Sequence, residues 1–163
     1  MDVQELDGRA VVSIQQAEKL GAIEDVLVNV QQHRVEGLQL KGTLLRSGPA
    51  VSWSRVRTVG VDAVMVDDNE AATSISEADR AQLMRLQSLR GMRVVTDAGE
   101  LIGTISSVDV DEGSGQIVYY LVDLGNGGLL HPNPRLRVPP AAIQGVGKDI
   151  MTVDARVVDF QRE

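Results

Sequence analysis

The sequence predicts an all-β protein built from two tandem copies of a small β-barrel domain, joined by a short linker that contains a short helix. Three observations predict this fold. The chain repeats itself in ordered blocks, apolar and polar residues alternate within each copy, and glycine-containing turns separate the apolar runs. The hydrophobic content of 43% and charged content of 24% are ordinary for a globular protein, so the 163 residues are expected to fold.

Three blocks of sequence recur in the same order. Leu6–Ser13 matches Leu89–Thr96 at an offset of 83 residues, Leu20–Val28 matches Ile102–Val110 at 82, and Val51–Asp67 matches Val138–Asp154 at 87. The larger last offset places about five extra residues in the second copy, between Tyr120 and Val138. We interpret the pattern as a duplication, with copies at residues 1–68 and 89–163 and a linker at residues 69–88.

The first copy has the apolar pattern of short strands. Val26, Val28 and Val30 alternate with their neighbours, as in a half-buried strand. A polar break at residues 31–33 then leads into a second apolar run, which predicts a hairpin. With Ala63–Val66 as a closing strand, five or six strands in about 70 residues suit a small closed or nearly closed barrel that leaves few exposed edges.

The linker has a different character from the copies it joins. Residues 69–74 are small and polar, and Ser76 is a good N-cap for a short helix whose first turn is acidic. The helix is expected to extend through Leu83, Met84 and Leu86. The sequence leaves open whether it packs on a barrel or only separates the two copies.

The second copy repeats the strand pattern. Val108 and Val110 precede a polar, glycine-containing turn at residues 111–115, and the apolar run 117–122 follows, which predicts another hairpin. Ile150–Val153 corresponds to the closing strand of the first copy.

These motifs resemble the PRC-barrel domain family. The run Leu-x-Gly-x-x-Val-Val-Ser, followed by a glycine and then Ile-x-x-Val-x-Val, carries the resemblance in both copies, at about residues 1–68 and 89–163. Leu124–Leu130 and Leu136–Pro139 are similar to the glycine-rich loop and Val-Pro strand of many such barrels, while residues 131–134 depart from that pattern. The family includes barrels of the photosynthetic reaction-centre H subunit and of the ribosome maturation factor RimM. The resemblance implies a barrel used as an adaptor, without a shared chemistry.

Few residues in the sequence suit catalysis or metal binding. The chain has no cysteine, which excludes disulfides, thiolate catalysis and cysteine-ligated zinc, and it has only two histidines. The acidic residues Asp109, Asp111 and Glu112 do not fit a calcium loop, and the glycine runs lack the spacing of a phosphate-binding loop. We therefore predict that the protein is not an enzyme and that it holds no metal and no cofactor.

Five residues of the second copy form the candidate interface or anion-binding site. They are Tyr119, Tyr120, His131, Arg135 and Arg137. Adjacent tyrosines in a strand face opposite sides, so one is expected to point inward and the other to serve as an interface anchor. An anion site predicts that the histidine and the two arginines converge on one pocket, and the alternative is a plain loop stiffened by prolines.

Two residues outside that site also have an expected role. His33 is expected to be a solvated residue of a hairpin turn. Trp53 is expected to fill a barrel end, with an interface role as the alternative.

The net charge of −7 makes direct nucleic-acid binding an unfavourable interpretation, because phosphate binding relies on clustered Lys and Arg. No signal-peptide pattern and no apolar run long enough to cross a membrane occur, so a cytoplasmic protein without a transmembrane segment is expected.

We predict a non-catalytic adaptor or scaffold that docks a protein partner, with self-association as a further property. Two alternatives stay open: an accessory factor in ribosome assembly or RNA processing that acts through a protein partner, and a small-ligand or anion-binding protein that uses the 125–137 loop.

Overall fold

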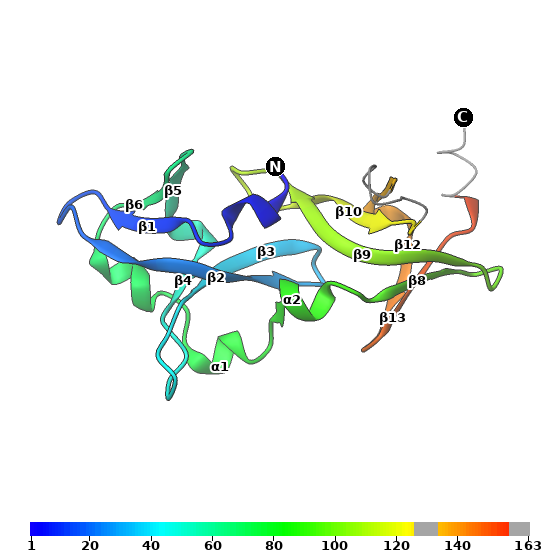
Figure 1. The fold of residues 1–163 in the computed structure, drawn as a ribbon, viewed down its shortest axis with the longest axis horizontal. Coiled ribbons are helices and arrows are strands. Elements are labelled where there is room, and N and C mark those ends of the chain that lie inside the picture. Colours follow the sequence, from blue (N-terminus) through cyan, green and yellow to red (C-terminus); the bar gives the residue numbers. More distant parts are fainter. Residues whose placement is uncertain (126–133, 157–163) are drawn as a thin grey trace.

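The computed structural model describes residues 1–125 and 134–156, and β-strands predominate in it (Figure 1). The described part of the first copy contains β1 (Ala10–Ser13), β2 (Lys19–Asn29), β3 (Arg34–Leu40), β4 (Ala50–Ser52), β5 (Val56–Val59) and β6 (Ala63–Val66). That of the second copy contains β8 (Arg93–Thr96), β9 (Leu101–Val110), β10 (Ile117–Asp123), β11 (Arg135–Val138), β12 (Ile143–Val146) and β13 (Ile150–Val153). Short 3-10 helices accompany them: η1 (Val3–Leu6), η2 (Trp53–Arg55), η3 (Asn69–Thr73) and η4 (Pro140–Ala142). The predicted all-β class is confirmed.

Both copies have the same strand topology. The first sheet has the order β4-β3-β2-β1-β6-β5, and the second has the corresponding order β11-β10-β9-β8-β13-β12. Among the described strands of each sheet, only the pair formed by the first and last strands of the copy, β1–β6 or β8–β13, is parallel. The duplication inferred from the sequence is therefore also a duplication of topology.

The hydrogen-bonded sheets are open rather than closed. Within the described ranges no strand pairing joins β4 to β5, or β11 to β12. The five extra residues fall in the β10–β11 connection, because Tyr120 pairs with Val138 just as Leu38 pairs with Val51.

A single apolar core runs through both copies. Equivalent positions are buried in each: Val11 and Val94 on the first strands, and Val64 and Met151 on the last, are all 0% exposed. Alternation of buried and less buried residues along these strands produces the period-2 pattern seen in the sequence. Since buried residues of both copies belong to one cluster, the two sheets stabilise each other.

The linker is part of the fold and not a spacer. Ser76 caps α1 (Glu77–Arg80) by accepting a hydrogen bond from the Asp79 amide over 3.1 Å, as expected. The single helix expected through Leu86 is wrong, however, because the chain leaves α1, forms β7 (Met84–Arg85) against β2, and then turns into α2 (Leu86–Leu89). This path buries Leu86 and Leu89, whereas α1 has no buried residue.

The two copies exchange their leading segments (Figure 1). β7, which leads into the second copy, pairs with β2 of the first, and the N-terminal residues of the first copy pair with β9 of the second. The bridged or hydrogen-bonded residues are Leu27–Arg85 and Val28–Met84 on one side, and Asp109–Asp2 and Val110–Met1 on the other. The helical turn after each segment also packs on the other copy: α2 packs on β2, and η1 packs on β9. The pairs occupy equivalent repeat positions, so the arrangement is that of an isologous dimer within one chain.

The tips of the two long hairpins also meet symmetrically. The Val35 amide donates to the Gly115 carbonyl over 2.7 Å, and the equivalent Ile117 amide donates to the His33 carbonyl over 2.8 Å. His33 and Gly115 are themselves equivalent, and both have positive φ, of 52° and 76°. We refer to the hairpin contact and the exchanged segments together as the junction.

Candidate functional site

The two adjacent tyrosines of β10 face opposite sides, as expected. Tyr120 is the inward one and is 0% exposed, while Tyr119 is half-buried. The Arg137 guanidinium of β11 lies 6.0 Å from the centre of the Tyr119 ring, within the range of a cation–π contact. Tyr119 and Arg137 are thus brought together on the outer side of the second sheet, whereas Tyr120 belongs to the junction.

The two arginines of the candidate site have different neighbours. Arg135 forms a salt bridge of 3.3 Å with Asp2 of the exchanged N-terminal segment, and Arg137 lies against Tyr119. His131 lies outside the described residues. The convergence that an anion site requires stays a prediction.

His33 lies in the hairpin turn, as expected, but it is partly buried at the junction, so its interpretation as a solvated residue is wrong. Its Nδ1 lies 2.8 Å from the Tyr120 hydroxyl, in a hydrogen bond whose donor depends on the imidazole tautomer, and the two rings meet edge to face. Burial lowers the pKa of His33 below its ordinary value and raises the pKa of Tyr120, because burial disfavours the charged form of each. The sequence could not reveal this contact, because its two residues lie in different copies.

Trp53 also lies at the junction. It is 5% exposed, and its Nε1 donates to the Glu112 carbonyl over 3.1 Å in the hairpin of the other copy. Trp53, the one tryptophan of the chain, therefore reports on the contact between the copies.

One carboxylate supports each exchanged segment. In one contact it belongs to the segment itself, and in the other it belongs to the strand that receives the segment. On β9 the N-terminal segment supplies Asp2, which accepts from the Ser107 hydroxyl and from the Gln4 amide. On β2 the strand itself supplies Asp25, whose Oδ1 accepts from the amides of Val26, over 2.8 Å, and Gln87, over 3.3 Å. Asp25 occupies the repeat position of Ser107.

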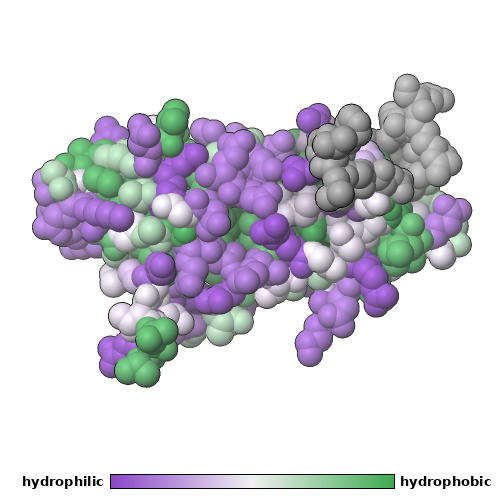
Figure 2. Space-filling view, viewed as in Figure 1, coloured by the Kyte–Doolittle hydropathy of each residue, from purple (hydrophilic) through white to green (hydrophobic). Residues whose placement is uncertain are grey.

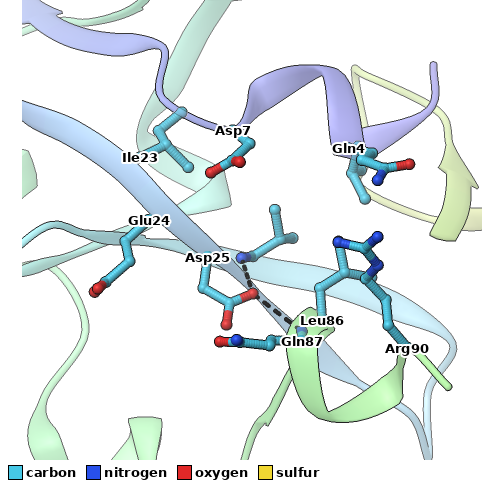
Figure 3. A pocket seen from close by; sticks show the side chains of 10 residues that line it. Gln4, Asp7, Ile23, Glu24, Asp25, Leu86, Gln87 and Arg90 are labelled. Atoms are coloured by element: carbon cyan, nitrogen blue, oxygen red, sulfur yellow. Dashed lines mark hydrogen bonds between the residues drawn. The ribbon is translucent and has the colours of Figure 1, made fainter. Parts of the chain in front are cut away.

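A pocket of about 300 Å³ adjoins Asp25 (Figure 3). Its walls come from β2 and from η1 and α2, each with the residue that follows it, so it lies where the two leading segments approach each other. Asp7, Glu24 and Asp25 line it together with Arg90. Asp25 is 8% exposed, and its Oδ2 is buried without a hydrogen-bond partner. We call this cavity the Asp25 pocket.

The β3–β4 loop, residues 41–49, exposes two adjacent leucines. Leu44 and Leu45 have relative exposures of 105% and 95%, and they form an apolar end on a loop that projects from the body (Figures 1 and 2). They are the central residues of a turn closed by the Thr43 amide, which donates to the Arg46 carbonyl over 3.0 Å. We call Leu44 and Leu45 the leucine tip. The signal for it in the sequence is the Leu-Leu pair between Gly42 and Gly48.

The base of this loop is held rigidly. The fully buried Gln39 donates from Nε2 to the Gly48 carbonyl over 2.7 Å, and Arg80 of α1 donates to the same carbonyl over 2.9 Å. Gly42 and Gly48 let the two strands of the loop approach closely, since a Cβ on Gly42 would lie 2.4 Å from the Gly48 nitrogen.

The described residues contain no group of three or more histidine or acidic side chains that could hold a metal ion. Nor do they contain a helix that is long and apolar enough to span a membrane.

Comparison with known proteins identifies the family of both copies. The family model of the PRC-barrel domain matches residues 1–72 and 82–159. Among solved structures, a 16S ribosomal RNA processing protein, RimM, of Pseudomonas aeruginosa is similar at 16% sequence identity, with 82% of this chain and 96% of that chain covered. Its TM-score of 0.32 is too low to support an argument about function. Comparison with curated proteins gives no match.

Proposed function

The chain belongs to the PRC-barrel domain family, and we propose that it is a non-catalytic protein-interaction module that docks a partner protein through the leucine tip. The observation that carries this proposal is the full exposure of Leu44 and Leu45 at the end of a well-anchored loop. Burial of a leucine side chain contributes about 1.5–3 kcal/mol, so the pair offers about 3–6 kcal/mol to a partner that covers it.

The anchored base of the loop favours binding. Because Gln39 and Arg80 fix the Gly48 carbonyl, less conformational entropy is lost when the tip is bound. A loop that served only as a connection would gain nothing from two exposed leucines, which cost solubility.

The charges around the tip indicate the chemistry of the partner. Lys41, Arg46 and Arg85 line the hollow beside the tip, against one acid, Glu24. This local excess of positive charge stands out in a chain with a net charge of −7. The surface fits a protein with an apolar groove and an acidic rim, because such a rim complements the basic residues.

The test compares proteins captured from host lysate by the wild type, by a Leu44→Ser/Leu45→Ser variant, and by Val61→Ser. Val61 is a matched control, since it is 88% exposed in the β5–β6 turn, away from the leucine tip. We expect one protein to be retained in the presence of RNase by the wild type and the control, and to be reduced at least tenfold with the double variant.

The captured protein is then purified and titrated directly against the three forms. Equal affinity of all three would contradict the proposal. Binding of the wild type to anionic vesicles instead, with loss in the double variant, would assign the tip to a membrane surface and would also contradict it.

The three other functional hypotheses, self-association, a role in ribosome assembly or RNA processing, and anion binding, stay predictions. Self-association is a further outcome of the same comparison, in which the captured protein is a second copy of this chain. A role in ribosome assembly or RNA processing depends on the family resemblance alone. Use of the 125–137 loop for an anion depends on His131, together with Arg135 and Arg137.

A further inference from the structure

We propose that the Asp25 pocket binds a guanidinium or primary ammonium group, held by the Asp25 carboxylate. The proposal is independent of the leucine tip, because it concerns a different surface, between η1, β2 and α2.

The first argument is the incomplete hydrogen bonding of Asp25. Its Oδ1 accepts two backbone hydrogen bonds. Its Oδ2 has no hydrogen-bond partner, although the residue is only 8% exposed. A buried carboxylate oxygen without a partner is unfavourable, since folding removes its water without a replacement. A donor that enters the pocket would remove this penalty.

The second argument comes from the equivalent contact in the other copy, where both oxygens of the supporting carboxylate have hydrogen-bond partners. Ser107 replaces Asp25, and the supporting carboxylate is Asp2, whose Oδ2 is paired with Arg135 over 3.3 Å. A guanidinium thus completes the carboxylate in one copy. In the other copy Arg85 stands at the position of Asp2, and the oxygen of Asp25 is left without a partner.

The third argument is the charge and size of the cavity. Asp7, Glu24 and Asp25 outnumber Arg90, so the pocket is negative and attracts a cation. A volume of about 300 Å³ accommodates a small amine or one long cationic side chain.

Access to the carboxylate requires a local rearrangement, because Oδ2 is buried in this structure. The exposed Gln87 side chain lies beside the carboxylate and is the group we expect to move (Figure 3). A change of the Gln87 rotamer is inexpensive for an exposed residue. The Gln87 backbone amide, which donates to Oδ1, need not move.

The probes distinguish the two sources of such a group. Agmatine represents a free small amine, and a blocked peptide with one central arginine represents a partner's side chain. The same peptide with citrulline in place of arginine is the neutral control, because its urea group has nearly the shape of a guanidinium without the charge. Binding is followed by isothermal titration and by the NMR shifts of the Val26 and Gln87 amides, both of which donate to Asp25.

The key variant is Asp25→Asn, which keeps an oxygen for the two backbone amides and removes the charge. Asp149→Asn, at an exposed turn outside the pocket, is the charge-matched control. We expect saturable binding of agmatine or the arginine peptide by the wild type and the control, and at least a tenfold loss in Asp25→Asn. Far-UV circular dichroism checks that Asp25→Asn is folded.

Three results would overturn the proposal: no saturable shift with either cationic probe, equal binding of the citrulline peptide, or unchanged binding by folded Asp25→Asn. Binding of agmatine alone assigns the pocket to a free small molecule. Binding of the arginine peptide alone assigns it to a partner's side chain.

Discussion

Substitution of Gly115 tests the junction between the two copies. Gly115 has a φ of +76°, and a Cβ there would lie 2.7 Å from the Val35 carbonyl oxygen and 2.8 Å from Cδ1 of Trp53. Gly99 is a matched control, since its φ is +86° but a Cβ there would meet nothing within 4 Å. Both Gly→Ala variants carry the left-handed backbone cost of about 1–2 kcal/mol. Only Gly115→Ala adds the overpacking cost, about 1–3 kcal/mol.

We therefore expect the free energy of unfolding to fall by about 1–2 kcal/mol in Gly99→Ala and by about 2–5 kcal/mol in Gly115→Ala. Urea titrations followed by far-UV circular dichroism measure the loss. The emission of Trp53, which donates to the Glu112 carbonyl across the junction, measures the local change. Equal losses in the two variants, with the Trp53 emission of the folded state unchanged in Gly115→Ala, would refute the tight hairpin contact.

Three further predictions concern the junction and the loop. Tyr120→Phe removes the hydroxyl that bonds His33 and should lower the free energy of unfolding by about 0.5–1.5 kcal/mol, measured by urea titration. Because burial lowers the pKa of His33, the unfolded chain binds its proton more readily, so stability should fall as the pH drops through 6.5 and level off below the folded-state pKa. Urea titrations from pH 7.5 to 5.5 should show this loss in the wild type and not in His33→Asn, whose side chain tolerates the positive φ. Arg80→Ala should speed amide hydrogen exchange in residues 41–48 and leave the exchange rates of strands β8 and β13 unchanged. Exchange rates in residues 41–48 equal to those of the wild type would contradict the anchoring of the loop.

Local sequence patterns predicted the strands well for a physical reason. The repeated Leu-x-Gly-x-x-Val-Val blocks reflect burial on one face of a strand, which depends on neighbours in the sequence. The half-buried strand expected from the alternation at Val26 and Val28 is wrong, because Leu27 between them is also buried, at 1% exposure. The N-cap at Ser76 was predictable for the same reason. The end of α1 was not, because pairing of Met84 with Val28 of a distant strand outweighs local helix propensity.

The residues that join the copies were missed because their partners lie far away in the chain. His33 does lie in a turn, but its burial depends on Tyr120, 87 positions later in the chain. Asp25 appeared to be the polar half of an alternating strand, and only the exchange of leading segments shows that it supports α2. Leu44 and Leu45 were visible in the sequence, but exposure of both side chains depends on the path of the loop.

The most direct test of the proposed docking function places a photoreactive amino acid at position 45 and, as the control, at position 61, and irradiates intact host cells. Both positions are highly exposed, but only position 45 belongs to the leucine tip. We expect position 45 to crosslink to one protein that position 61 does not reach, and we expect Leu44→Ser to reduce that product. The same crosslinked proteins from both positions, or lipid as the only product from position 45, would contradict docking of a partner protein by the leucine tip.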